Sequence, residues 1–167
     1  MIFIKKNVKR IGIRINEDFE AVVTYPLLTS KRKAEKFAAK NQAWIERAIQ
    51  QKKAFHEQHY VENPTSDEAK KELVDIATPM LKHWEDLTGL RVKKLRARYM
   101  TSRWGSYSKK TGVITLSTQL LGFDKDVINY IVLHELAHVK YPNHGQGFKC
   151  FVAEYMPNWK EYRARLR

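Results

Sequence analysis

The sequence predicts an α+β protein in which short strands and amphipathic helices occupy separate parts of the chain. Isoleucines alternate with small or polar residues near the start, and two long segments then carry apolar residues three and four positions apart. A second pair of strand-like segments directly precedes a strongly apolar helix. Because 167 residues leave little room for a second independent core, we expect a single domain over 1–167. Its N-terminal hairpin and helix occupy 1–62, and a second region occupies 67–167.

The N-terminal region begins with a β-hairpin. Ile11, Ile13 and Ile15 alternate with Gly12, Arg14 and Asn16, and a returning strand over 21–25 ends at Pro26. Thr29 or Ser30 can then cap a long helix. We expect Trp44 to pack in the core, and the apolar face to contain Ala34, Phe37, Ala38, Ile45, Ala48 and Ile49.

The second region starts after a polar connector at 62–67. A helix is expected from there to about Leu87, with Pro79 kinking or interrupting it. Strands are predicted over 91–100 and 113–118, separated by a polar loop at 106–112.

The charge balance favours anionic partners. The chain has 31 basic and 18 acidic residues, a net charge of +13 and a pI near 9.8. Such a surface fits anionic substrates or nucleic acid. No apolar run is long enough to cross a bilayer, and Met1–Asn7 is too short for a signal peptide. The single cysteine, Cys150, excludes an intrachain disulfide and is expected to be a small buried apolar group. We therefore expect a cytoplasmic protein without membrane contact.

A buried helix is predicted from Asp124, its N-cap, to about Tyr141, where Pro142 stops it. It carries His134, Glu135 and His138 with apolar residues on almost every side. Residues four apart lie on one face of a helix, so both imidazoles can bind one metal ion.

A third metal ligand must follow this helix. His144 is favoured because the chain can fold back after Pro142, and Glu154 on the next predicted helix is the rival. Three histidine ligands leave one coordination position open, as in catalytic zinc sites, and Glu135 would act as general base. Arg103 precedes a strand expected to run along the site, so it can contact a substrate carboxylate or phosphate or stabilise an oxyanion. Its alternative role is structural, pairing with neighbours of Glu135 or capping a helix.

Several motifs in order carry a family resemblance. They are Thr101–Ser106, the strand Val113–Ser117, His134–His138, Pro142–His144 and Tyr155–Lys160. Together they resemble the YgjP-type metal-dependent hydrolases, which are related to the SprT-like and other zincin metallopeptidases. The resemblance covers about Arg91–Arg167. The cysteine usual in that family after Ser106 is Tyr107 here, which argues against an essential thiol at that point.

The resemblance implies a zincin-like α+β fold, with a small sheet packed on the metal-binding helix and helices at the C-terminal end. It also implies one zinc ion on His134, His138 and His144, with Glu135 as general base. Three functions remain open. A zinc metallopeptidase is favoured, and the alternatives are a nucleoside triphosphate pyrophosphatase, for example converting UTP to UMP and diphosphate, and a nucleic-acid-associated protease or module. The oligomeric state is left open.

Overall fold

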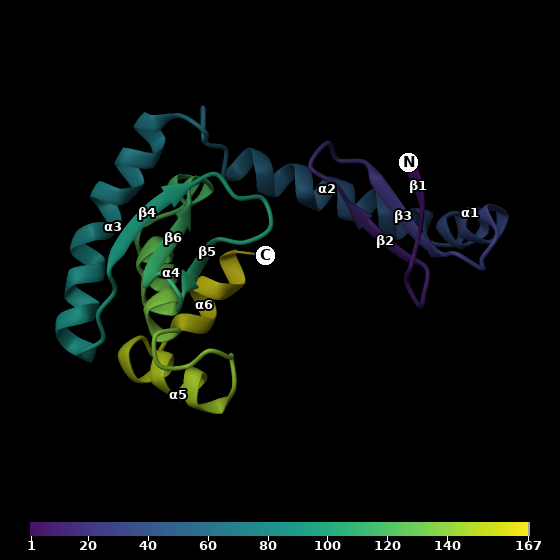
Figure 1. The fold of residues 1–167 in the computed structure, drawn as a ribbon. Coiled ribbons are helices and arrows are strands. Elements are labelled where there is room, and N and C mark those ends of the chain that lie inside the picture. Colours follow the sequence, from purple (N-terminus) through teal and green to yellow (C-terminus); the bar gives the residue numbers. More distant parts are fainter. Residues whose placement is uncertain (167) are drawn as a thin grey trace. The chain divides into compact units, whose positions relative to one another are not determined.

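The computed structural model describes residues 1–166 and consists of two compact units, Met1–Gln58 and His59–Arg167 (Figure 1). The boundary lies close to residue 62, the predicted end of the N-terminal region. Each unit has its own hydrophobic core. The α+β class is confirmed, whereas the number of domains stays a prediction. Among the described helices, none combines the length and apolar character needed to cross a membrane.

The first unit contains a three-stranded sheet in the order β1-β3-β2. The predicted hairpin is confirmed: β2 (Gly12–Ile15) pairs antiparallel with β3 (Ala21–Pro26). A strand that the sequence analysis missed, β1 (Ile2–Lys6), pairs parallel with the other side of β3. Only Phe3 of this edge strand is even partly buried, so β1 has no alternating pattern that could reveal it.

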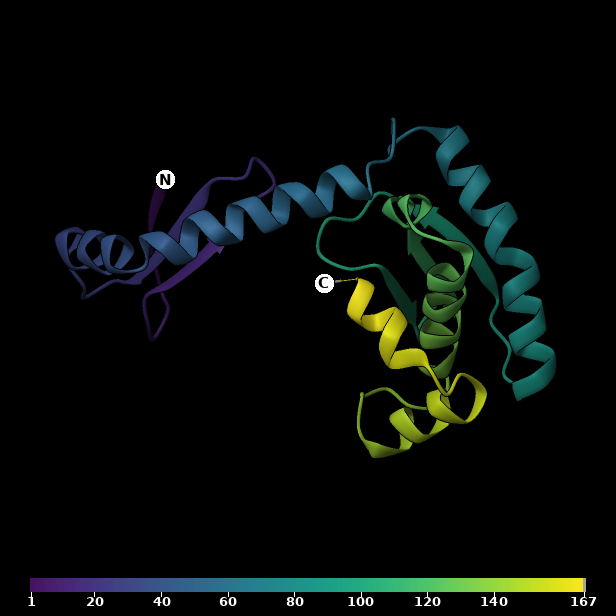
Figure 2. The ribbon, with the colours of Figure 1, turned by 180° about the vertical axis from the view of Figure 1, so that it is seen from behind.

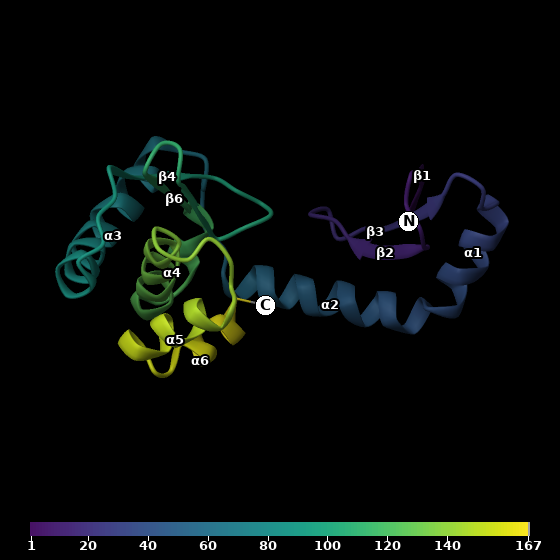
Figure 3. The same ribbon diagram turned by 60° about the horizontal axis from the view of Figure 1, so that its bottom comes forward.

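The single long helix predicted after Ser30 is wrong, because the chain forms α1 (Lys31–Lys40) and α2 (Gln42–Gln58) instead. Ser30 caps α1 as expected, its Oγ accepting from the Lys33 N–H at 3.4 Å. Asn41 ends α1, and its Nδ2 donates to the Phe37 carbonyl at 2.7 Å. The helical direction changes at this break (Figure 3).

The predicted apolar face of this segment is only partly buried. Ala34, Ala38 and Ile45 are buried as expected. Phe37 and Trp44 are instead 38% and 46% exposed, which corrects their assignment to the core. Two alanines let α1 approach β3 closely and direct Phe37 to the rim, and the break at Asn41 resets the helical phase before Trp44.

The second unit begins with α3 (Asp67–Thr88). Ser66 caps it by accepting from the Ala69 N–H at 3.0 Å, and Gly89 ends it in the left-handed conformation with φ 72°. Pro79 lies inside the helix without interrupting it, so the interruption, one of the two expected effects, is wrong. Buried Leu73, Ala77 and Leu81 hold α3 against the core on both sides of the proline, and this packing offsets the lost hydrogen bond.

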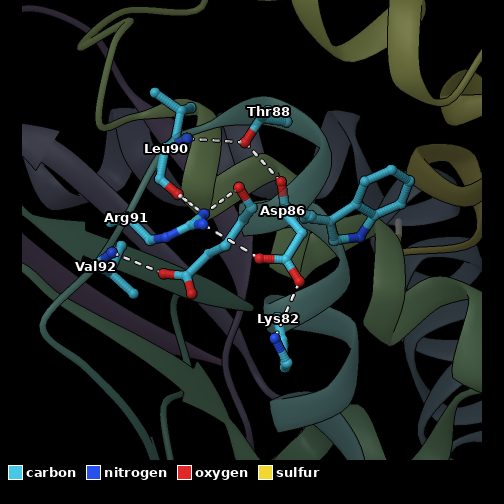
Figure 4. Close-up of polar contacts among 8 residues, drawn as sticks. Lys82, Asp86, Thr88, Leu90, Arg91 and Val92 are labelled. Atoms are coloured by element: carbon cyan, nitrogen blue, oxygen red, sulfur yellow. Dashed lines mark hydrogen bonds and ion pairs between the residues drawn. The ribbon is translucent and has the colours of Figure 1, made fainter.

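Polar contacts fix the connection from α3 to the next strand (Figure 4). The Leu90 N–H donates to Thr88 Oγ1 at 3.2 Å, and the Val92 N–H donates to Glu85 Oε1 at 2.9 Å. Arg91 pairs with Asp86 at 3.2 Å. These contacts turn the chain sharply, so the following strand runs back along α3.

The second sheet has the order β4-β6-β5. β4 (Lys94–Arg98) is parallel to β6 (Val113–Ser117), and β5 (Gly105–Ser108) is antiparallel to β6. The predicted polar loop over 106–112 is therefore wrong in its first three residues, 106–108, which belong to β5. The sequence Gly-Ser-Tyr-Ser has no apolar alternation, and only backbone pairing with β6 makes it a strand. A short 3-10 helix, η1 (Thr118–Gly122), follows the sheet.

Helix α4 (Lys125–Ala137) is the centre of this unit and lies between α3 and the C-terminal helices (Figures 1 and 2). It is buried along most of its length, as predicted, but ends at Ala137 rather than near Tyr141. Its apolar residues pack on α3 and on the sheet. Asp124 is the N-cap residue, yet its carboxylate pairs with Arg165 instead of capping the helix.

The chain continues with α5 (Gln146–Tyr155) and α6 (Trp159–Arg165). They are the C-terminal helices that the family resemblance implies, and Arg167 lies outside the described part of the chain. Met156 and Trp159 are buried in the core. Cys150 is exposed on α5, which corrects the expectation of a buried thiol, because Phe148, Phe151 and Val152 supply the inward face of that helix.

Leu73→Ala is expected to lower the free energy of unfolding by about 2–5 kcal/mol, because it leaves a cavity at a fully buried position of α3. Leu87→Ala, a 54% exposed position on the same helix, is the matched control and should change stability by about 0.5 kcal/mol or less. Urea denaturation monitored by tryptophan fluorescence measures both. Equal effects would contradict the description of this core.

Candidate metal centre

Three histidine side chains converge at the end of α4. His134 lies in the last turn of the helix, His138 is its C-cap, and His144 lies in the connection to α5. Their candidate ligand nitrogens all lie within 4.8 Å of one another. The Nε2 atoms of His134 and His144 are 2.9 Å apart. The structure thus brings together the three residues that the sequence predicts as a ligand set.

The fold returns His144 to the helix through a short connection. The Tyr141 N–H donates to the Ala137 carbonyl at 2.9 Å, and Pro142 then prevents the helix from continuing. Phe148 of α5 packs against all three imidazoles, with ring centroids 4.7 to 4.9 Å apart. A buried phenyl ring therefore supports the cluster from one side.

Hydrogen bonds and burial prepare the imidazoles as ligands. His138 donates from Nδ1 to the Tyr141 carbonyl at 2.9 Å, which leaves its Nε2 as the atom with a free lone pair. The Tyr130 hydroxyl lies 3.4 Å from His134 Nδ1. Burial lowers the pKa of His134 to about 3, with further contributions from His138 and His144. Burial also lowers the pKa of His144. Neutral imidazoles are the form that binds metals.

The cluster fits a tetrahedral metal such as zinc. Two nitrogens bound to one tetrahedral zinc ion at about 2.0–2.1 Å would lie roughly 3.3 Å apart, close to the 2.9 Å between His134 and His144. Three protein nitrogens leave one coordination position for a reactant. Glu154, the rival ligand, is exposed on α5 and outside this group.

Glu135 lies beside the histidines and is only 5% exposed. Burial raises its pKa to about 8, while a hydrogen bond with the Tyr107 backbone and the charge of Arg103 act in the opposite direction. Gly105 of β5 faces this carboxylate. A Cβ at Gly105 would lie 2.6 Å from Glu135 Oε1 and 2.7 Å from its Cγ, so Glu135 occupies the space that a side chain would need.

These groups line a cavity of about 910 Å³ within the second unit. Strand β5 forms one wall, the end of α4 forms another, and α5 and α6 complete it. Arg103, the predicted substrate contact, also lines it. The sequence analysis missed β5 and Gly105 as parts of the site. Two sequence signals pointed to them: the motif Thr101–Ser106 of the family resemblance, and Gly105 itself, since a glycine within a strand often marks a close approach.

A helix with His-Glu-x-x-His whose histidines meet a third histidine beside a small sheet defines the zincin-like class of metallopeptidase folds. The sequence profile of the YgjP-like metallopeptidase domain matches residues 56–167, which is most of the chain and all of the candidate metal centre. The chain belongs to this family.

Similar proteins come from archaea. The chain is 30% identical to the uncharacterized protein MJ0123 of Methanocaldococcus jannaschii, over 53% of this chain and 81% of that protein. Among solved structures, the crystal structure of the metallopeptidase zymogen of Pyrococcus abyssi abylysin is similar to this chain, with a TM-score of 0.50 and 29% sequence identity. The match covers 54% of this chain and 90% of that one. The zymogen jannalysin from M. jannaschii is 25% identical with a TM-score of 0.42, over 56% and 92%.

Gly105→Ala is expected to abolish most hydrolytic activity while the protein keeps its metal, because the three atoms nearest the new methyl group all belong to Glu135, whose carboxylate must move. Overpacking should also cost about 1–3 kcal/mol of stability. Gly12→Ala is the matched strand control, since its Cβ would meet only Thr24 Oγ1 at 3.5 Å. Activity assays with parallel metal analysis test this. Full activity of Gly105→Ala would show that the Glu135 position is unimportant.

Proposed function

We propose that the protein is a zinc-dependent metallopeptidase in which His134, His138 and His144 bind one zinc ion and Glu135 is the general base. The observation that carries this proposal is the convergence of three imidazoles beside a buried carboxylate in one cavity. Membership of a metallopeptidase family supports the reaction class.

The donor set favours zinc. Three imidazoles with one open position match catalytic zinc sites, whereas calcium and magnesium prefer oxygen ligands. When bound, a zinc ion supplies Lewis-acid chemistry, polarising a carbonyl oxygen and making a water molecule more acidic.

Glu135 handles the proton in this proposal. Its carboxylate accepts a proton from the attacking water and donates it to the amine that leaves when the peptide bond breaks. Burial makes the carboxylate a better proton acceptor than an exposed glutamate. The backbone hydrogen bond from Tyr107 and the contact with Gly105 hold the side chain in place.

The position of β5 favours a peptide substrate. This strand is at the edge of its sheet, pairs with β6 on one side and lines the cavity through Gly105, Ser106 and Tyr107. Extended peptides bind to such edges by adding a strand. The cavity is within the size range of sites that accept a ligand of several residues.

His144→Ala is expected to weaken zinc binding by more than about 100-fold, because it removes one of the three proposed ligands. Loss of a residue that only hydrogen-bonds to a ligand typically weakens metal binding by about 10- to 100-fold. His83→Ala, which removes an exposed histidine of α3, should bind zinc as the unchanged protein does. Competition with a chromogenic chelator measures both affinities. Equal zinc affinities would refute the proposed ligand set.

Glu135→Gln is expected to retain zinc but lose about 100- to 10,000-fold in kcat, because glutamine cannot accept the proton. The assay uses a panel of unfolded proteins, peptides and nucleoside triphosphates. Peptide cleavage that disappears in this variant supports the proposal. Hydrolysis of nucleoside triphosphates alone, lost in the same variant, would instead make the protein a pyrophosphatase.

A further inference from the structure

Basic side chains surround the candidate metal centre. Four cationic residues line its cavity and come from different segments: Arg103 precedes β5, Lys109 follows it, Lys149 lies on α5 and Arg163 lies on α6. Glu135 is the only acidic residue of the lining, and it is buried. The whole chain has 18 acidic residues for 31 basic ones, so an exposed lining without any acid departs from its average composition.

These four cations have no acidic partner at ion-pair distance in the described residues, although the charge of Arg103 acts on Glu135 from farther away. Elsewhere Lys82 and Arg91 pair with Asp86, and Arg165 pairs with Asp124. Within residues 1–166, none of the four lining cations takes part in an ion pair. All four are exposed to solvent, and Arg163 rests its guanidinium over the Trp159 ring at 5.8 Å. The charges are therefore available to a bound molecule.

A cavity lined by one sign of charge concentrates its electric field inside the opening and draws in ligands of the opposite sign. Arginine offers a planar fork that matches a carboxylate, while lysine contributes a mobile point charge. Basic or neutral peptides would gain nothing from this lining. Peptides that carry carboxylates would gain contacts at the wall formed by β5 and at the facing helices.

We propose that the cationic lining formed by Arg103, Lys109, Lys149 and Arg163 makes the site selective for peptide segments rich in aspartate and glutamate. The inference rests on the proposed peptidase function and adds the class of substrate. The carboxylate can belong to a side chain or to the C-terminus of the substrate, and the two sources are separable by blocking that terminus.

The test compares quenched fluorescent peptides of equal length that differ only in containing glutamate, glutamine or lysine around one cleavable bond. All carry blocked termini, and the glutamine peptide is also made with a free C-terminus. For the zinc-loaded protein, kcat/KM for the glutamate peptide should exceed that for the glutamine peptide by about tenfold, with the lysine peptide slowest. The preference should shrink between about 20 mM and about 500 mM salt. A free C-terminus that alone restores fast cleavage would assign the carboxylate to the substrate terminus.

A charge-matched pair of variants separates the lining from the overall charge. The first variant replaces three cations of the lining together: Lys109→Gln, Lys149→Gln and Arg163→Gln. It should reduce the preference for the glutamate peptide to about twofold or less, mainly through a change in KM. The control variant removes the same charge from exposed positions outside the lining: Lys94→Gln, Lys110→Gln and Lys160→Gln. It should keep the preference for the glutamate peptide. Equal preferences in both variants would overturn the proposal.

Binding distinguishes failure of this inference from failure of the peptidase proposal. Fluorescence anisotropy on the zinc-loaded Glu135→Gln protein measures affinity without cleavage, and the uncleaved glutamate peptide should bind about tenfold more tightly than the glutamine peptide. Selective binding without cleavage by the unchanged protein would support the inference and refute the peptidase. Cleavage without any preference for glutamate would refute the inference alone.

Discussion

The burial of α4 is the constraint on which the rest of the second unit depends. This helix is apolar on almost every side, so α3, the sheet and the C-terminal helices must all pack around it. Two polar residues near the end of this helix, His134 and Glu135, face the cavity. The candidate metal centre therefore depends on how the elements around α4 pack, since Phe148 of α5 contacts both His134 and His138.

The cavity combines segments that are distant in the sequence. The helix supplies the first two imidazoles and the carboxylate, a short return supplies His144, and β5 supplies the facing wall. Two contacts hold the C-terminal end: Trp104 Nε1, directly before β5, donates to the Leu166 carbonyl at 3.2 Å, and Arg165 pairs with Asp124 at the start of α4. Arg163 is held at the cavity by these contacts. One packing arrangement therefore brings together the three histidines and Glu135, the edge strand β5 and the basic residues of the cavity lining.

Much of this arrangement could be predicted from the sequence, and the exceptions have physical causes. Hydrophobic periodicity located α3, α4 and the β2–β3 hairpin, because their buried faces repeat at helical or strand spacing. The histidines could be found because the spacing of metal ligands on a helix is itself a geometric rule. Strands β1 and β5 escaped because backbone pairing, which leaves no pattern in side chains, forms them. Asn41 broke a helix whose apolar spacing predicted continuity. Cytoplasmic location and contact with nucleic acid stay predictions.

The close approach of Gly105 to Glu135 has a consequence for entropy. A glutamate side chain that is free to rotate loses about 1.5–2 kcal/mol of conformational free energy when it is fixed. Here the backbone of β5 fills the space on one side of the carboxylate, and a Tyr107 backbone hydrogen bond fixes the other end. The side chain is therefore ordered when the protein folds, and no ordering is left for the moment at which a substrate reacts. The absence of a side chain at one position of an edge strand thus holds the Glu135 carboxylate in one place.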